Sequence, residues 1–332
     1  MTIQGSAWRH FLVAVGSAAA FAAWAHGDHG AAPQAASVAA ATVPMEVRSV
    51  APDVYYVQGL SALGSPKNQN FISNAGFVVT QDSVVVIDAL GSPALAEELV
   101  RRIRAITPKP IRTVILTHYH ADHIYGLQVF QALGAKIVAN GLAREYINSE
   151  TARLRLEASR TELAPWIDAS TRMVGADRWI DGDATQLTIG GTEFVLQHMG
   201  PAHTPEDTAV FLPQTGALFI GDVVFRNRIP YVGQADSRHW IAALDALLKL
   251  PVKVMVPGHG PASEDPKADM QLTRDYLGFL REAMGKAAQN LDPFEDAYRA
   301  TDWSRFAGYP LFKEANRMNA YNTYLLMEQE KP

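Results

Sequence analysis

A dense group of histidines placed directly after a strand is the feature that most limits how this chain can fold. The run Ile111–Leu116 predicts a strand buried on both faces, and it leads straight into Thr-His-Tyr-His-Ala-Asp-His at 117–123. Residues 124–133 then predict a helix. The histidines therefore lie on a strand-to-helix loop at the carboxyl end of a strand, which is where α/β proteins tend to place their chemistry.

This loop carries four candidate metal ligands, His118, His120, Asp122 and His123. The chain has no cysteine, and imidazole nitrogen and carboxylate oxygen are the ligands that zinc and iron accept where thiolate is absent. In an extended segment His118 and His120 point to the same side and can reach one metal ion. Asp122 and His123, where the chain turns into the helix, suit a second ion. The alternative is a histidine-rich surface loop without metal, in which the crowded imidazoles would gain nothing.

The elements on both sides of the loop predict a mixed α/β fold. Strands are expected at 54–57, 76–80, 83–87, 186–189, 193–197, 208–212, 217–220 and 252–256. Helices are expected at 92–106, within 141–166, at 237–248 and beyond Asp265-Pro266. Two α/β halves of similar plan predict two sheets packed face to face with helices outside, followed by a C-terminal helical extension.

Three further residues of metal-binding type stand alone later in the chain. His203 follows a strand within Gly-Pro-Ala-His-Thr-Pro, Asp222 ends a strand within Gly-Asp, and His259 ends the last strand within Pro-Gly-His-Gly. Taken singly, each is more often an ordinary loop residue than a ligand. Their order along the chain and their neighbouring glycines and prolines make them candidates here.

The His-x-His-x-Asp-His motif and these three later residues resemble the metallo-β-lactamase superfamily from about residue 46 to 262. The resemblance implies an αβ/βα four-layer sandwich with a dinuclear site at one edge. It places His118, His120 and His203 on the first metal, Asp122, His123 and His259 on the second, and Asp222 between both. Asp88, at the end of the strand 83–87, matches an aspartate of this family, and we expect it to support the ligand loop. An ordinary turn carboxylate is the alternative for Asp88.

A dinuclear site of this kind predicts hydrolysis. Two metal ions about 3.5–4 Å apart can share one water and lower its pKa toward neutrality, so that a metal-bound hydroxide attacks a carbonyl carbon or a phosphorus atom. We expect two zinc ions, with iron or manganese as alternatives. Asp122 is expected to orient the hydroxide and move its proton, a catalytic role that the resemblance also implies.

Several substrates and functions remain open at this stage. The favoured reaction is hydrolysis of an ester, thioester or lactone, because in the resembled family thioesterases of the glyoxalase II type and lactonases carry the bridging carboxylate and the β-lactamases lack it. A class B β-lactamase is the runner-up. The stretch 226–231 resembles exported zinc hydrolases that accompany quinoproteins and sulfur oxidation. A mononuclear iron dioxygenase would not need His123 and His259, and a non-catalytic metal-binding module is the last alternative.

The loop after Asp222 is the candidate for substrate selection. Tyr231 is placed to donate a hydrogen bond to a developing oxyanion, and Arg226 or Arg228 to pair with a substrate carboxylate. In the alternative, Tyr231 packs under the loop and both arginines face water.

The N-terminus predicts export. Arg9 and His10 precede an apolar run at 11–23, and Ala23-Trp24-Ala25 offers a cleavage site, so residues 1–25 read as a signal peptide. The apolar run is shorter than the roughly 20 residues of a membrane span. We therefore expect a periplasmic or secreted protein with no stable membrane insertion after cleavage.

Composition and boundaries complete the prediction. Residues 26–45 are rich in alanine and proline and predict a flexible tail, 46–262 the metal-binding domain and 263–332 the helical extension. A net charge of −5 argues against nucleic acid or anionic lipid as the main partner and leaves a small-molecule substrate. The sequence names no protein partner.

Overall fold

The computed structural model describes residues 40–233 and 235–330, which fall within one compact unit. The predicted signal peptide and residues 26–39 of the predicted tail lie outside the described residues. Within the described part, no helix is long and apolar enough to cross a membrane.

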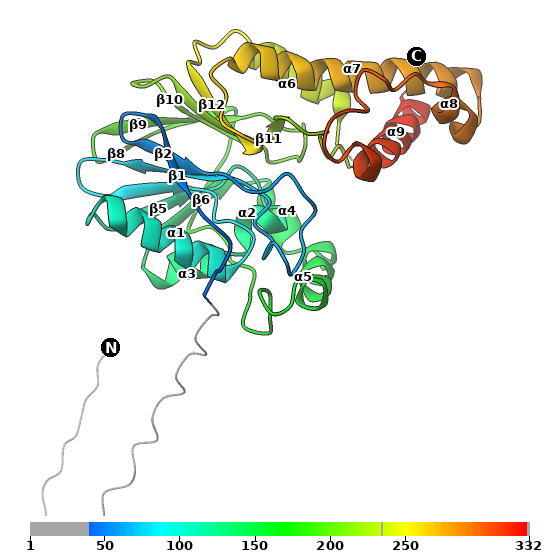
Figure 1. Cartoon of the computed structure of the whole chain (residues 1–332). Coiled ribbons are helices and arrows are strands. Elements are labelled where there is room, and N and C mark those ends of the chain that lie inside the picture. Colours follow the sequence, from blue (N-terminus) through cyan, green and yellow to red (C-terminus); the bar gives the residue numbers. More distant parts are fainter. Residues whose placement is uncertain (1–39, 234, 331–332) are drawn as a thin grey trace, which may run out of the picture. The chain divides into compact units, whose positions relative to one another are not determined.

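The described strands form two sheets (Figure 1). The first sheet runs in chain order: β1 (Val47–Ala51), β2 (Val54–Val57), β3 (Ala75–Val79), β4 (Val84–Ile87), β5 (Ile111–Ile115), β6 (Lys136–Asn140) and β7 (Arg178–Ile180). The second sheet has the order β12-β11-β10-β9-β8, with β8 (Ala184–Ile189), β9 (Thr192–His198), β10 (Thr208–Leu212), β11 (Ala217–Phe225) and β12 (Val254–His259). The pairs β4–β5 and β11–β12 are parallel, so the loops that follow β4 and β5 leave one edge of the first sheet together.

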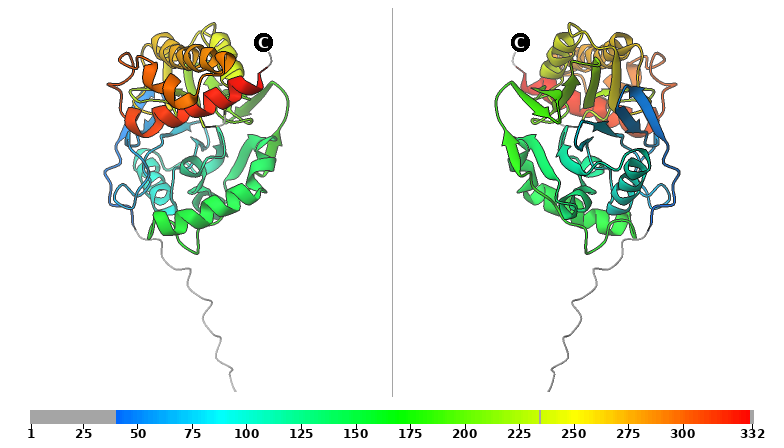
Figure 2. Two further views of the ribbon diagram at one scale, coloured as in Figure 1. Left: turned by 90° about the vertical axis from the view of Figure 1, so that its right-hand side faces the viewer. Right: turned by 90° about the vertical axis from the view of Figure 1, so that its left-hand side faces the viewer.

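Helices cover the outer faces of both sheets. The helices of the described residues are α1 (Pro93–Ile106), α2 (Ala121–Ile124), α3 (Leu127–Ala132), α4 (Ala143–Ile147), α5 (Glu150–Glu162), α6 (Ser237–Leu247), α7 (Pro266–Asn290), α8 (Phe294–Ala300) and α9 (Phe312–Gln329). In both views of Figure 2 the orange and red helices α7 to α9 lie on one side and the green helix α5 on the opposite side. The helical extension therefore packs on the side of the second sheet.

Three buried apolar clusters separate four layers. Leu95 and Leu99 of α1 pack with Val86 and Val114 behind the first sheet. Ile87, Ile115, Phe194 and Val210 meet between the two sheets, and Trp240 and Tyr276 pack behind the second. Each layer buries apolar faces against the next, which is how such sandwiches are stabilised. The predicted four-layer α/β sandwich with a C-terminal helical region is confirmed.

Three local predictions need correction. The helix expected at 124–133 is broken, because the chain turns at Gly126 to contact the loop after β4, where a Cβ would lie 2.0 Å from the Ala89 carbonyl oxygen. The strand at 111–115 is not buried throughout, since Arg112 is exposed and only its last residues are covered on both faces. The strands β1, β6 and β7 were not predicted.

Asp222 does not end a strand, as the sequence suggested, but lies inside β11. The pairing of β11 with β12 shifts register around Gly221, which has a φ of +54°. A bulge of this kind re-aims the following side chain while the strand continues. A Cβ at position 221 would lie 2.7 Å from the Thr117 Cβ, so glycine is needed both for the backbone and for the close approach of the two sheets.

Candidate metal centre

The structure brings His118, His120, His203 and Asp222 into one cluster. One ligand atom from each residue lies within 4.8 Å of the others. The two closest imidazole nitrogens, His120 Nδ1 and His203 Nε2, are 3.0 Å apart, and His203 Nε2 is 3.4 Å from Asp222 Oδ2. The residues come from the loop after β5, the loop after β9 and the bulge in β11, so segments far apart in the sequence converge on this cluster.

A second cluster adjoins the first and contains Asp122, His123 and His259. Asp122 Oδ2 lies 3.3 Å from His259 Nε2 and 3.7 Å from His123 Nε2. Asp122 and His123 belong to α2, which begins immediately after the histidine loop, and His259 is the last residue of β12. The family resemblance implies the same two groups, except that it places Asp222 between both ions.

Asp222 faces both clusters. Its Oδ1 is 3.3 Å from His123 Nε2, and its Oδ2 is 3.2 Å from His259 Nε2 and 3.4 Å from His203 Nε2. A carboxylate in this position is able to place one oxygen on each of two cations.

Hydrogen bonds on the far side of two imidazoles fix which nitrogen faces the clusters. His123 Nδ1 is 2.9 Å from Asp88 Oδ2, and His259 Nδ1 is 2.7 Å from the Ile72 carbonyl oxygen. Asp88 also accepts hydrogen bonds from the Thr117 backbone N–H and hydroxyl, both at 2.8 Å. The Nδ1 hydrogens are thereby used, and Nε2 is the nitrogen that is left to face a cation. Asp88 therefore contacts both His123 and Thr117, the residue at which the ligand loop begins.

Several buried polar atoms at the clusters fit divalent cations. His118 Nε2, His123 Nε2 and Asp222 Oδ1 are buried and have no hydrogen-bond partner among the described residues. Buried polar atoms without partners are costly, and a cation satisfies lone pairs that no N–H or O–H reaches. Nitrogen and oxygen donors without sulfur are the set that zinc, iron and manganese accept.

The comparison with known families agrees with this geometry. The family model of the metallo-beta-lactamase superfamily matches residues 69–259, more than half of the chain. The chain belongs to the metallo-beta-lactamase superfamily. The members of this superfamily are metal-dependent hydrolases.

The individual relatives are distant. The 2,4-dinitroanisole O-demethylase subunit alpha of Nocardioides sp. (strain JS1661) is 28% identical over 66% of this chain and 62% of that protein. The linear primary-alkylsulfatase of Pseudomonas sp. (strain ATCC 19151) is 24% identical over 60% of this chain and 44% of its own. This chain therefore spans less than two thirds of either relative. A solved metallo-beta-lactamase from Pontibacter korlensis has a TM-score of 0.56 and 25% identity, covering 71% of this chain and 99% of its own.

The two clusters of this metallo-beta-lactamase superfamily member differ in their protonation. Burial, with the nearby His123, lowers the pKa of His118 well below its usual range, and burial with the nearby His120 lowers the pKa of His203 to about 3. Burial also acts to lower the pKa of His123, but the carboxylates of Asp122 and Asp222 outweigh it and raise that pKa well above its usual range. The imidazoles of His118 and His203 are therefore neutral without metal, whereas a cation entering the second cluster must displace a proton from His123.

The predicted substrate residues have partners of their own. Arg226 Nε pairs with Asp269 of α7 at 2.7 Å, and the half-exposed Tyr231 directs its hydroxyl to Met318 Sδ of α9 at 3.8 Å. Arg228 is buried, with Nη1 3.2 Å from His259 Nδ1 and its guanidinium over the Phe225 ring. Substrate contacts by these three residues stay predictions, and of the three Arg228 lies directly against a cluster residue.

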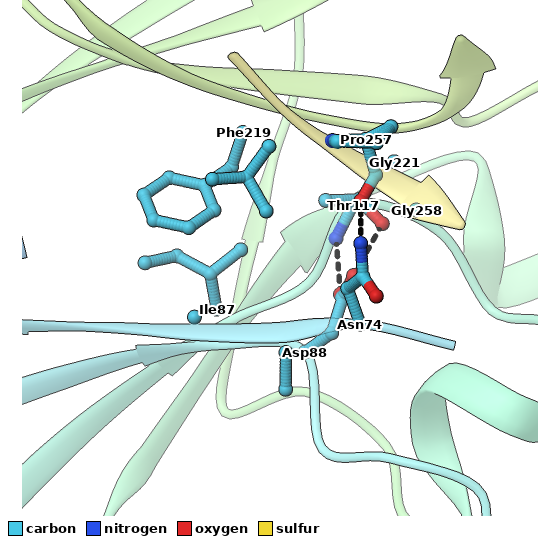
Figure 3. Close-up of a pocket in the computed structure, with 11 residues that line it drawn as sticks. Asn74, Ile87, Asp88, Thr117, Phe219, Gly221, Pro257 and Gly258 are labelled. Carbon is cyan, nitrogen blue, oxygen red and sulfur yellow. Dashed lines mark hydrogen bonds between the residues drawn. The ribbon is translucent and has the colours of Figure 1, made fainter. Parts of the chain in front are cut away.

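Asn74, which the sequence did not single out, ties β3 to the segment that carries His259. Its backbone N–H donates to the Gly258 carbonyl oxygen at 2.8 Å, and its amide donates to those of Pro257 and Gly260 at 2.7 Å each. Figure 3 shows Asn74 reaching across to Pro257 and Gly258 beside a small cavity between the sheets. No local signal distinguishes this asparagine from one in an ordinary turn, because its partners lie more than 180 residues away.

Gly258→Ala is expected to remove metal binding. A Cβ there would lie 2.0 Å from Asp222 Oδ1 and 2.8 Å from the Gly221 carbonyl carbon, so the carboxylate that faces both clusters must move. Metal content after dialysis measures the effect. Gly278→Ala in α7 is the matched control, since nothing lies within 4 Å of its Cβ position, and it is expected to add up to about 1 kcal/mol of stability with unchanged metal content. Normal metal content in Gly258→Ala would contradict the close packing.

Proposed function

We propose that this protein is an exported hydrolase that holds two zinc ions and cleaves an ester, thioester or lactone. The observation that carries the proposal is the position of Asp222 between the two clusters. Its Oδ2 lies 3.4 Å from His203 of the first cluster and 3.2 Å from His259 of the second, and its Oδ1 lies 3.3 Å from His123 of the second. Export follows from the predicted signal peptide.

The residues form two groups of metal ligands. His118, His120 and His203 would hold one ion, Asp122, His123 and His259 the other, and Asp222 both. When bound, such a pair supplies a hydroxide at neutral pH and polarises the substrate oxygen. The cysteine-free donor set suits zinc, with iron or manganese as alternatives.

Asp122 is the chain's own candidate for moving the proton. Its side chain is 16% exposed, compared with 5% for Asp222, so a water or substrate is able to reach it. Burial alone would raise the pKa of Asp122, but His123 and His259 outweigh it and keep that pKa well below the usual range. The carboxylate is therefore ionised near neutral pH and able to accept a proton.

β-Lactam hydrolysis is the second candidate, favoured by the similarity to the Pontibacter korlensis metallo-beta-lactamase over 99% of that chain. Asp222 argues for the first candidate, because the resemblance assigns the bridging carboxylate to thioesterases and lactonases of this superfamily. The alkylsulfatase relative makes an alkyl sulfate a comparison substrate for the screen. A purely metal-binding module has no support from the superfamily, whose members are hydrolases.

Metal analysis coupled to a hydrolysis screen tests the proposal. We expect two metal ions per chain under metal-replete conditions, and turnover of a thioester, a lactone or a carboxylic ester in preference to a chromogenic cephalosporin, an alkyl sulfate and an aryl methyl ether. One ion per chain would overturn the dinuclear site, and preference for the cephalosporin would favour the second candidate. The mass of protein recovered outside the cytoplasm tests export, with a chain beginning at His26 expected.

A further inference from the structure

We infer that two consecutive buried carboxylates, Glu206 and Asp207 before β10, are positioning residues that set the metal affinity of the His118–His120–His203 cluster. The inference rests on the proposed function in one respect, that this cluster binds a metal ion. It concerns two residues that lie outside both clusters and that the sequence did not single out.

Glu206 holds the loop between the first two histidines. Its Oε1 accepts a hydrogen bond at 3.2 Å from the backbone N–H of Tyr119, the residue between His118 and His120. Two residues further on, the Thr208 backbone N–H donates to the Thr117 carbonyl oxygen at 2.8 Å. The start of β10 thus binds the histidine loop twice within three residues, which limits how far His118 and His120 can move apart.

Asp207 holds the loop that carries the third histidine. Its Oδ2 accepts a hydrogen bond at 2.7 Å from the backbone N–H of Thr204, directly after His203, and its Oδ1 accepts one at 2.8 Å from the Thr204 hydroxyl. Its carbonyl oxygen accepts from the Met199 N–H at 2.7 Å, which closes the loop. The backbone next to each of the three histidines of the first cluster is therefore held by one pair of neighbouring carboxylates, at Tyr119 by Glu206 and at Thr204 by Asp207.

The burial of both carboxylates indicates that Glu206 and Asp207 do more than hold the two loops in place. Glu206 is 4% exposed and Asp207 1%, and neither carboxylate has a lysine, arginine or histidine nitrogen within 4.0 Å among the described residues. Burial, together with the nearby Glu206 and Asp222, raises the pKa of Asp207 despite its two hydrogen bonds to Thr204. Buried carboxylates without a cationic partner are costly. A divalent cation in the adjacent cluster supplies the missing positive charge, so the two acids and the cation stabilise one another.

Metal titration of variants in which only one of the two clusters is intact tests the inference. The probe is Co²⁺, followed by calorimetry and by its visible absorption, with the full chain freed of metal. In the His259→Ala background, which keeps the first cluster, Glu206→Ala is expected to weaken Co²⁺ binding roughly 10–100-fold and to alter the absorption band. In the His203→Ala background, which keeps the second cluster, the same substitution is expected to leave affinity within about twofold.

Two further variants keep the result interpretable. Glu98→Gln alters another buried glutamate, on α1 and paired with Arg101 and Arg102, and is expected to leave both affinities unchanged. Glu206→Gln keeps an acceptor for Tyr119 and removes only charge. It is expected to fall between wild type and Glu206→Ala, weaker than wild type by about threefold or more, and it carries the test if the alanine variant does not fold.

The outcomes separate this inference from the proposed function. A wild-type chain that binds one ion or none contradicts the proposed function. A wild-type chain that binds two ions, with Glu206→Ala and Glu206→Gln binding Co²⁺ at the first cluster as tightly as wild type, overturns only the positioning role. Equal losses in both backgrounds also overturn it, because they would mean general loss of structure.

Discussion

Asp222→Ala is expected to abolish most of the hydrolytic activity and to release the metal of the second cluster more readily than that of the first. The Asp222 carboxylate lies 3.3 Å from His123 Nε2 and 3.2 Å from His259 Nε2, and it is buried to 4% exposure. The second cluster then retains one carboxylate ligand and two histidines, whereas the first keeps its three histidines. We expect kcat/KM to fall by at least about 1,000-fold, which is about 4 kcal/mol of transition-state stabilisation.

Metal content and thermal unfolding in the presence and absence of zinc measure this effect. Zinc raises the melting temperature by binding the folded state, and in Asp222→Ala that increase should shrink markedly. Asp183→Ala is the matched control, because Asp183 is exposed and lies outside both clusters. Two tightly held ions per chain in Asp222→Ala would show that this carboxylate does not join the clusters.

The four-layer fold was predictable from the sequence because strand and helix signals alternate clearly along most of it. Ser92-Pro93 starts α1 as the capping pattern requires, with the Ser92 hydroxyl accepting from the Leu95 N–H. The strands that were missed carry weak signals. β1 lies at the sheet edge with two exposed side chains, and Lys136–Asn140 of β6 is a short apolar run whose periodicity does not separate strand from helix.

The grouping of the site residues was predictable in part because of the histidine motif. His118 and His120 lie two residues apart on an extended segment and therefore point to the same side. Asp122 and His123 follow where the helix begins and point in another direction, so local geometry separates these two pairs. The bulge that aims Asp222 was not predictable, because it depends on the close approach of Gly221 to Thr117 from the other sheet.

The residues that hold the site together were the hardest to find. Ile72 acts through its backbone carbonyl oxygen, which any residue type offers, and Asn74 and Glu206 act on segments 183 and 87 residues away. The position of the loop directly after Asp222 in the sequence did not predict which residues its side chains contact. The extension contacts that loop through Asp269 and Met318, so Arg226 and Tyr231 make contacts that local sequence could not indicate.

Asp122→Asn is expected to lower kcat far more than metal content. Asp122 is the partly exposed acid of the second cluster. Asparagine keeps its shape and one oxygen for that cluster, but it has no carboxylate that can accept a proton. General base catalysis contributes roughly 10²–10⁴-fold, so we expect kcat to fall within that range, with KM changed by less than about threefold.

The measurement is steady-state kinetics at saturating zinc, on the best substrate from the screen, together with metal content of the same sample. Asp122→Glu tests position, because it restores a carboxylate one methylene further out and is expected to recover part of the lost rate. If Asp122→Asn retains the wild-type kcat with two bound ions, another group accepts the proton. If its second ion is lost at saturating zinc, Asp122 acts chiefly as a ligand. A large fall in kcat with both ions retained is the result that assigns the proton transfer to Asp122.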